Sequence, residues 1–121
     1  MLGSDRILFS MKSADLFTEL TAIYRRHGWQ LRSALLRPET RVEVQSLLSG
    51  DVAVKEAEFD ALWFSRPSHN NREAWELRLL AQTQYALFET FEADETEEER
   101  DDLRLEMEAR LREYLATDKR G

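Results

Sequence analysis

Apolar residues recur at every second position along four short segments of the chain. These segments are Trp29–Arg37, Phe59–Ser65, Glu73–Ala81 and Gln84–Glu92. Alternation with a period of two is typical of strands that bury one face and leave the other polar. The last three segments follow one another through short stretches rich in turn-forming residues, which favours antiparallel pairing. The sequence therefore predicts three or four strands in a mainly antiparallel sheet.

Two further segments have the period of an amphipathic helix. The first begins at Ser13, a residue suited to cap a helix, and ends before Gly28, which readily adopts the left-handed conformation that closes a helix. The second begins at the capping box Thr96–Glu99. Its apolar stripe comprises Leu103, Met107, Leu111, Tyr114 and Leu115. Together with the strands, these segments predict a small α+β domain with an N-terminal helix and a long C-terminal amphipathic helix.

Two segments allow alternative interpretations. Glu39–Ser49 suits a short helix, although Val42 and Val44 also alternate as they would in a strand. Arg72–Ala93 contains neither Gly nor Pro and many good helix formers, so one long helix competes there with two strands. Polar residues would interrupt the apolar face of such a long helix. We therefore favour two strands in the second segment and a short helix in the first.

The length and composition fit one folded domain. The chain has 121 residues, of which 42 % are hydrophobic, and this length suits one core rather than two. We expect a flexible N-terminal segment at residues 1–12, a single domain at 13–117 and a frayed tail at 118–121. No apolar run approaches the roughly 20 residues that span a bilayer, so no membrane partner is expected. The sequence has no cysteine, which fits a cytoplasmic protein.

Negative charge is concentrated in the second half of the chain. The formal charge is −7, with a balance of +2 over residues 1–50 and −9 over residues 51–121. Nine carboxylates and only one basic residue lie between Glu89 and Asp102. Such a surface repels phosphate backbones over about 8 Å at physiological salt, which disfavours nucleic acid as a partner. One group in the first half has the basic and aromatic composition that suits single-stranded nucleic acid. It comprises Arg25, Arg26, Trp29, Arg32 and Arg37.

The loop after Phe59–Ser65 is the strongest candidate for a small-ligand site. Its side chains can hydrogen-bond an anion such as phosphate or carboxylate, and the candidate residues are Arg66, Ser68, His69, Asn70 and Arg72. Pro, Ser and Asn are also selected by turn geometry alone. A solvated hairpin turn is therefore the preferred interpretation, with an anion site as the alternative.

No motif supports covalent catalysis or metal binding. The chain lacks the Gly-x-Ser-x-Gly elbow and a glycine-rich phosphate loop. Its two histidines, His27 and His69, have no second ligand at helical or hairpin spacing. The carboxylates after Thr96 diverge around a helix axis and lack the Asp-rich loop that converges on calcium. We expect no metal and no cofactor, and a non-catalytic role is favoured.

The second face of the predicted sheet has more apolar residues than a solvated face needs. If the residues that face the helices are Trp29, Leu31, Leu35, Trp75, Leu77 and Leu79, those that point away are Leu36, Leu62, Phe64, Leu80 and Phe88. An exposed apolar patch usually marks an interface, most often between two copies related by a two-fold axis. The alternative is that the two long helices cover opposite faces within a monomer.

The sequence thus favours protein association as the function. The expected protein is a homodimeric adapter or an accessory protein for another polypeptide, with those five apolar residues at its interface. The rival hypothesis is a small anionic-ligand binder, or an enzyme in which Arg66 and Arg72 hold an anion and His69 acts as an acid or base.

Overall fold

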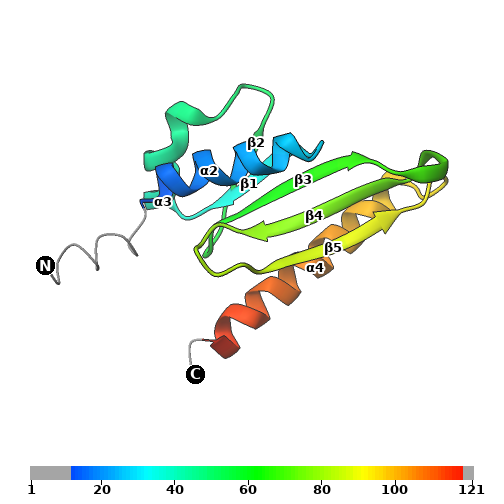
Figure 1. Ribbon diagram of the computed structural model, residues 1–121. Helices are drawn as coiled ribbons and strands as arrows, with labels where there is room; N and C mark the ends of the chain where they lie inside the picture. The colour runs from blue at the N-terminus through cyan, green and yellow to red at the C-terminus, as the bar shows by residue number, and fades with distance from the viewer. Residues whose placement is uncertain (1–11, 119–121) are drawn as a thin grey trace, which may run out of the picture.

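The computed structural model describes residues 12–118 and contains three helices and five strands (Figure 1). In chain order they are α2 (Ser13–Arg26), β1 (Gln30–Leu36), α3 (Pro38–Val44), β2 (Ala53–Glu56), β3 (Ala61–Pro67), β4 (Glu73–Leu79), β5 (Ala86–Phe91) and α4 (Glu97–Asp118). Short 3-10 turns occupy Gln45–Leu47 and His69–Asn71. The predicted flexible segment 1–12 lies outside the described residues except for Lys12. The predicted frayed tail likewise lies outside them except for Asp118, the last residue of α4.

The strands form one mixed sheet in the order β2-β1-β3-β4-β5. β1, β3, β4 and β5 are antiparallel neighbours, whereas β2 runs parallel to β1 after a crossover through α3. The α+β class is therefore confirmed. The predicted number of three or four strands is too low, because the four-residue strand β2 was not identified in the sequence.

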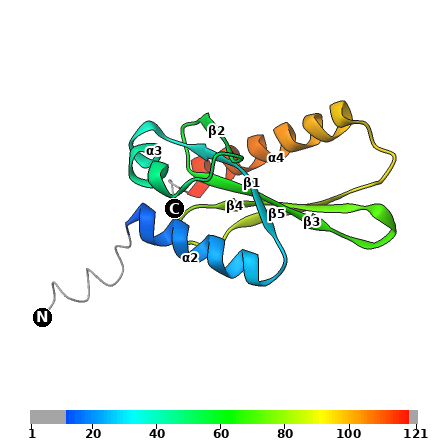
Figure 2. The same cartoon turned by 90° about the horizontal axis from the view of Figure 1, so that it is seen from above.

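Helices cover both faces of the sheet. Figure 2 shows α2 and α4 on opposite sides of the strands, with α3 at the end of the sheet next to the start of α2. Between α4 and the sheet lies one cluster of buried side chains, comprising Leu35, Phe59, Ala61, Trp63, Trp75, Leu77, Leu79, Leu87, Phe91, Met107 and Leu111. Beneath α2 and α3 lies a second cluster, comprising Phe17, Leu20, Ala34, Leu36, Val44, Leu62, Phe64 and Leu80. The domain therefore has three layers.

This arrangement corrects the expected placement of four interface residues. The four residues that point away from α4 are buried beneath α2, and no more than 7 % of the surface of each is exposed. They are Leu36, Leu62, Phe64 and Leu80. The apolar character of the second sheet face is satisfied within the monomer, because α2 covers it. Only Phe88 of the five residues remains exposed.

Local signals place the helix ends close to where they were expected. Gly28 follows α2 with a φ of +85°, in the left-handed region that glycine tolerates best. Ser13 is the first helical residue rather than the cap, which is Lys12. At α4, the Thr96 amide donates to Glu99 Oε1 at 2.8 Å and the Glu99 amide donates to Thr96 Oγ1 at 3.1 Å. The predicted capping box is therefore confirmed.

Both ambiguous segments are resolved. Pro38 occupies the first turn of α3, where its missing N–H costs nothing, and the segment is helical as far as Val44. Arg72–Ala93 contains β4 and β5 rather than one long helix. The four strands predicted from period-two alternation are all present, with ends that differ by up to two residues from those expected.

Candidate functional site

The sheet face beyond the C-terminal end of α2 is partly open. α2 ends at Arg26, so it does not cover the adjoining parts of β3 and β4, where the small side chain of Ala74 lies. A hollow of about 610 Å³ results, lined by His27, Gly28, Arg66, Pro67, Ser68, His69, Ala74 and Phe88. This hollow extends from the end of α2 to the edge strand β5.

Two aromatic rings and one guanidinium group define the chemistry at this place. Trp29 lies edge-on to Phe88, with 6.3 Å between the ring centroids. The guanidinium carbon of Arg66 lies 4.6 Å from the centroid of Trp29, a cation–π distance. Arg66 Nη1 also donates to the His27 carbonyl at 2.8 Å, at the negative end of α2. The result is an apolar surface next to a fixed positive charge.

Phe88 is the apolar residue most exposed to solvent at this site. Its side chain is 57 % exposed, although it lies on a strand and contacts Trp29. Burying a phenylalanine side chain stabilises a complex or a fold by about 1.5–3 kcal/mol. A partner that covers Phe88 would gain that contribution.

The outer edge of β5 is unpaired within residues 12–118, because β5 is the last strand of the sheet. The Leu79 amide donates to the Tyr85 carbonyl at 3.0 Å, so Leu79 and Tyr85 form a hydrogen-bonded pair. Leu77 and Leu87, two residues further along each strand, form the next pair of this type. Hydrogen-bonded and non-hydrogen-bonded pairs alternate in an antiparallel ladder. The backbone groups that point to the open edge are therefore those of Ala86, Phe88 and Thr90. We call these groups, together with the side chains of Phe88, Trp29 and Arg66, the β5 edge surface.

The loop between β3 and β4 forms a tight turn. Asn70 and Asn71 have φ angles of 58° and 60°, and the Arg72 amide donates to the His69 carbonyl at 3.1 Å. Positive φ at both central residues is what a primed hairpin turn requires, and asparagine tolerates it better than most residues. The turn geometry thus accounts for both asparagines.

Both loop arginines have partners within the protein. Arg72 Nε donates to Glu92 Oε1 at 2.9 Å, and both side chains are substantially exposed. Arg66 is turned toward α2 and Trp29. Exposed ion pairs of this kind contribute only about 0–1 kcal/mol, so an anion site at the loop stays a prediction.

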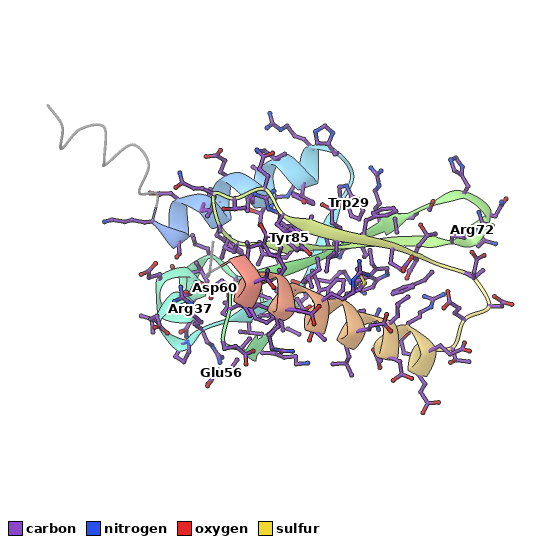
Figure 3. All side chains as sticks on the ribbon, turned by 90° about the horizontal axis from the view of Figure 1, so that it is seen from below. Trp29, Arg37, Glu56, Asp60, Arg72 and Tyr85 are labelled. Atoms are coloured by element: carbon purple, nitrogen blue, oxygen red, sulfur yellow. The ribbon has the colours of Figure 1, made fainter. Side chains whose placement is uncertain are left out.

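The structure brings together only part of the residue set named from the sequence. Arg66, Ser68, His69 and Phe88 line the same hollow. Arg66 and Ser68 also line a neighbouring hollow of about 350 Å³ together with Arg72, whereas Asn70 lines neither. Arg72 lies at the hairpin (Figure 3), where it pairs with Glu92. The remaining candidates, the four leucine and phenylalanine residues beneath α2, take no part in this surface.

Two residues of the site were missed as such from the sequence. The sequence places Trp29 in a basic and aromatic group, and Ala74 carries no signal because its importance lies in its small size. The pairing of Arg66 with Ala74 and of Glu76 with Phe88 brings Arg66, Ala74 and Phe88 close together across three strands. Trp29 joins them from the residue before β1, where its ring contacts both Arg66 and Phe88. Only the register of the sheet could have identified them.

Comparison with protein-family models, with curated proteins and with solved structures found no match. Among residues 12–118, no group of three histidine, aspartate or glutamate side chains is arranged to hold a metal ion. Over the same residues, no helix combines the length and the apolar composition needed to cross a membrane.

Proposed function

We propose that the protein is a non-catalytic interaction domain that pairs with a second copy through the β5 edge surface. The observation that carries this proposal is a half-exposed phenylalanine on a strand whose outer backbone groups are unpaired within residues 12–118. Strand addition at an open edge supplies main-chain hydrogen bonds, and side chains such as Phe88 supply specificity.

The opposite edge of the sheet is less suited to this role. β2 has only four residues, and its Lys55 and Glu56 side chains are exposed. Short edge strands with charged side chains are a common protection against edge-to-edge association. β5 has six residues, and the three that face the open edge, Ala86, Phe88 and Thr90, are uncharged.

A two-fold axis at Phe88 gives a consistent register for the pair. The two β5 strands are then antiparallel, with Phe88 opposite Phe88 of the second copy and Ala86 opposite Thr90. Each of these pairs is of the hydrogen-bonded type, because all three residues direct their backbone groups outward. Glu89 lies opposite Leu87 of the second copy, so no like charges face each other across the joint.

The antiparallel arrangement also separates the acidic segments. β5 ends at Phe91, three residues from Phe88, so the chains that lead to the two copies of residues 94–102 leave the strands on opposite sides of the axis, about 20 Å apart at the rise of an extended strand. This distance exceeds the screening length of about 8 Å at physiological salt. The carboxylates of residues 94–102 therefore oppose such a dimer only weakly.

The decisive variant is Phe88→Glu in the full chain. Sedimentation equilibrium over a wide range of protein concentration should show the wild type approaching twice the monomer mass. Because each dimer loses two buried phenylalanines, the variant should dimerise at least about 100-fold more weakly. Thr90→Pro is a second test, since proline removes an outward N–H without breaking the ladder to β4.

Leu105→Glu is the matched control. Leu105 is 56 % exposed on α4, almost the same as Phe88, but it lies on the other side of the sheet. It should leave the dimer unchanged. A wild type that stays monomeric at the highest concentration would contradict self-association. A dimer that survives Phe88→Glu but not Leu105→Glu would place the interface on α4 instead.

A further inference from the structure

A second cavity lies at the end of the molecule opposite the β3–β4 hairpin. It has a volume of about 520 Å³ and is bounded by the C-terminal part of α4, the start of α3 and the turn between β4 and β5. Its apolar wall includes Phe59, Leu79, Leu80, Ala81, Leu115 and Ala116. Figure 3 shows Arg37 and Asp60 at this end, far from Arg72. None of the side chains that define the β5 edge surface lines this cavity.

Two guanidinium groups line the cavity. Arg37 donates through Nε and Nη2 to Asp60 Oδ2, at 3.1 and 2.8 Å. Arg112 donates through Nε to Glu58 Oε1 at 3.0 Å, and its guanidinium carbon lies 5.4 Å from the centroid of the Phe59 ring. Among residues 12–118, Nη1 of Arg37 and both terminal nitrogens of Arg112 make no hydrogen bond. Donors for an anion therefore remain at the cavity.

The two arginines differ in how firmly they are held. Asp60 is buried and also accepts from Thr40 Oγ1 at 2.7 Å, which fixes Arg37. Glu58 is 67 % exposed and Arg112 is 50 % exposed, so their ion pair is in contact with solvent. The hydrogen bond from Arg112 holds the pKa of Glu58 below its ordinary value, so Glu58 is ionised at neutral pH. Exposed pairs are weak, and Arg112 can exchange Glu58 for another carboxylate.

We propose that this cavity binds a small carboxylic acid with an apolar body. The carboxylate accepts hydrogen bonds from Arg112, with Arg37 as the second cation, and the apolar body lies against Phe59 and Leu115. A volume of 520 Å³ falls within the range of about 300–1,000 Å³ that is usual for small-molecule sites. A mostly apolar wall with a few placed polar groups is their usual composition. The planar fork of arginine matches a carboxylate in geometry as well as charge.

Octanoate, octanol and octylamine form the series that tests this proposal. They share one alkyl chain and differ in the charge of the head group, which is negative, neutral and positive. In calorimetric titrations of the full chain, octanoate should bind at least about tenfold more tightly than octanol, a difference of about 1.4 kcal/mol. Octylamine should bind most weakly. Amide chemical shifts of Leu79, Leu80 and Ala81 should change on binding, and those around Phe88 should not.

Substitutions separate the charge from the apolar wall. Arg112→Met keeps an unbranched side chain over Phe59 but removes the charge, so octanoate should lose most of its advantage in affinity over octanol. Arg110→Met is the control, because Arg110 is an exposed arginine of the same helix that does not line the cavity. Ala116→Trp fills the cavity and should abolish binding of all three compounds.

Three results would overturn the proposal. One is the absence of saturable octanoate binding, and another is equal affinity for all three head groups. The third is a set of chemical-shift changes centred on the β5 edge surface rather than on the cavity. None of these results bears on self-association, because dimerisation is measured without ligand and depends on Phe88.

Discussion

Asp60 is a buried carboxylate that joins the start of β3 to the start of α3. It accepts hydrogen bonds from the Arg37 amide at 2.8 Å, from the Arg37 guanidinium and from the hydroxyl of Thr40. Arg37 and Thr40 lie at the first turn of α3, so Asp60 serves from the start of β3 as the cap that α3 lacks locally. The bonds with Asp60 also raise the pKa of Arg37, which stays charged at every relevant pH.

Asp60→Ala should destabilise the fold substantially. The substitution leaves the Thr40 hydroxyl and the Arg37 amide without their acceptor, and we expect a loss of about 2–4 kcal/mol in the free energy of unfolding. Urea denaturation of both proteins measures the loss. Glu58→Ala is the matched control, because it removes a solvent-exposed carboxylate paired with Arg112. Equal effects of the two substitutions would show that burial of Asp60 contributes nothing.

Tyr24 is the residue whose ionisation couples most clearly to the fold. Its ring stacks on Phe64 with 4.0 Å between centroids, and its hydroxyl donates a hydrogen bond to Glu76. Burial raises the pKa of Tyr24 above its ordinary value, and the hydrogen bond to Glu76 and the charge of Glu76 raise it further.

The raised pKa of Tyr24 predicts a loss of stability in alkali. Above about pH 10 the unfolded chain releases the phenol proton while the folded chain retains it. The unfolded state then binds fewer protons, so the free energy of unfolding falls as pH rises, until the folded phenol titrates as well. Denaturation at about pH 9 and about pH 11 should show a smaller decrease for Tyr24→Phe than for the wild type. An identical decrease in both proteins would contradict this coupling.

At the scale of single elements, the sequence predicted those with strong local signals. The capping box fixed the start of α4, and every residue of its predicted apolar stripe packs against the sheet, with Met107 and Leu111 fully buried. Alternation located four strands, because each of them has a face that must be apolar. β2 has one half-buried residue, Val54, among exposed neighbours, so no comparable pattern marks it.

A bulge in β1 explains why part of the alternation was assigned to the wrong face. Trp29, Leu31, Ser33 and Leu35 alternate in the sequence and were expected on one side. The register with β3 shifts between Leu31 and Ser33, so one additional residue is accommodated there. Trp29 and Leu31 consequently pack with the cluster beneath α2, while Leu35 belongs to the cluster beneath α4. A single extra residue moves every earlier position of the strand to the opposite face of the sheet. No residue type in the sequence indicates where such a bulge lies.

At the scale of the whole molecule, the sequence could not assign helices to faces. It predicted an apolar second face correctly, and the fully buried Leu36, Leu62 and Phe64 confirm that this face is apolar. It could not show that α2 and α4 lie on opposite sides, because the apolar face of an amphipathic helix does not indicate which face of a sheet it covers. The interface inferred from that face was therefore misplaced, and only Phe88 remains a candidate.

The candidate sites were predictable only where neighbours in sequence supply them. Arg66, Ser68 and His69 were named together because they are consecutive or nearly so. Trp29 joins them from 37 positions away in the sequence. The second cavity combines Arg37 with Arg112, which lie 75 positions apart in the sequence. Such combinations depend on strand order, which alternation alone does not determine.

The central position of β3 has a consequence for how the protein opens. β3 is hydrogen-bonded to β1 on one side and β4 on the other, and its residues Ala61–Ser65 are buried on both faces. In the described part of the chain, β2 and β5 each have a single neighbouring strand. Their amides can therefore exchange with solvent through local openings, whereas those in the middle of β3 require most of the domain to separate.

Hydrogen–deuterium exchange of the native protein measures this difference. The amides of Leu62, Trp63 and Phe64 should be the slowest to acquire deuterium, at a rate set by global unfolding. Faster exchange there than in β4 would contradict this order. β3 also connects the part of the chain that holds α2 and α3 to the part that holds β4, β5 and α4. The two parts thus share one strand, and the exchange rate of its slowest amides measures how often both parts unfold together.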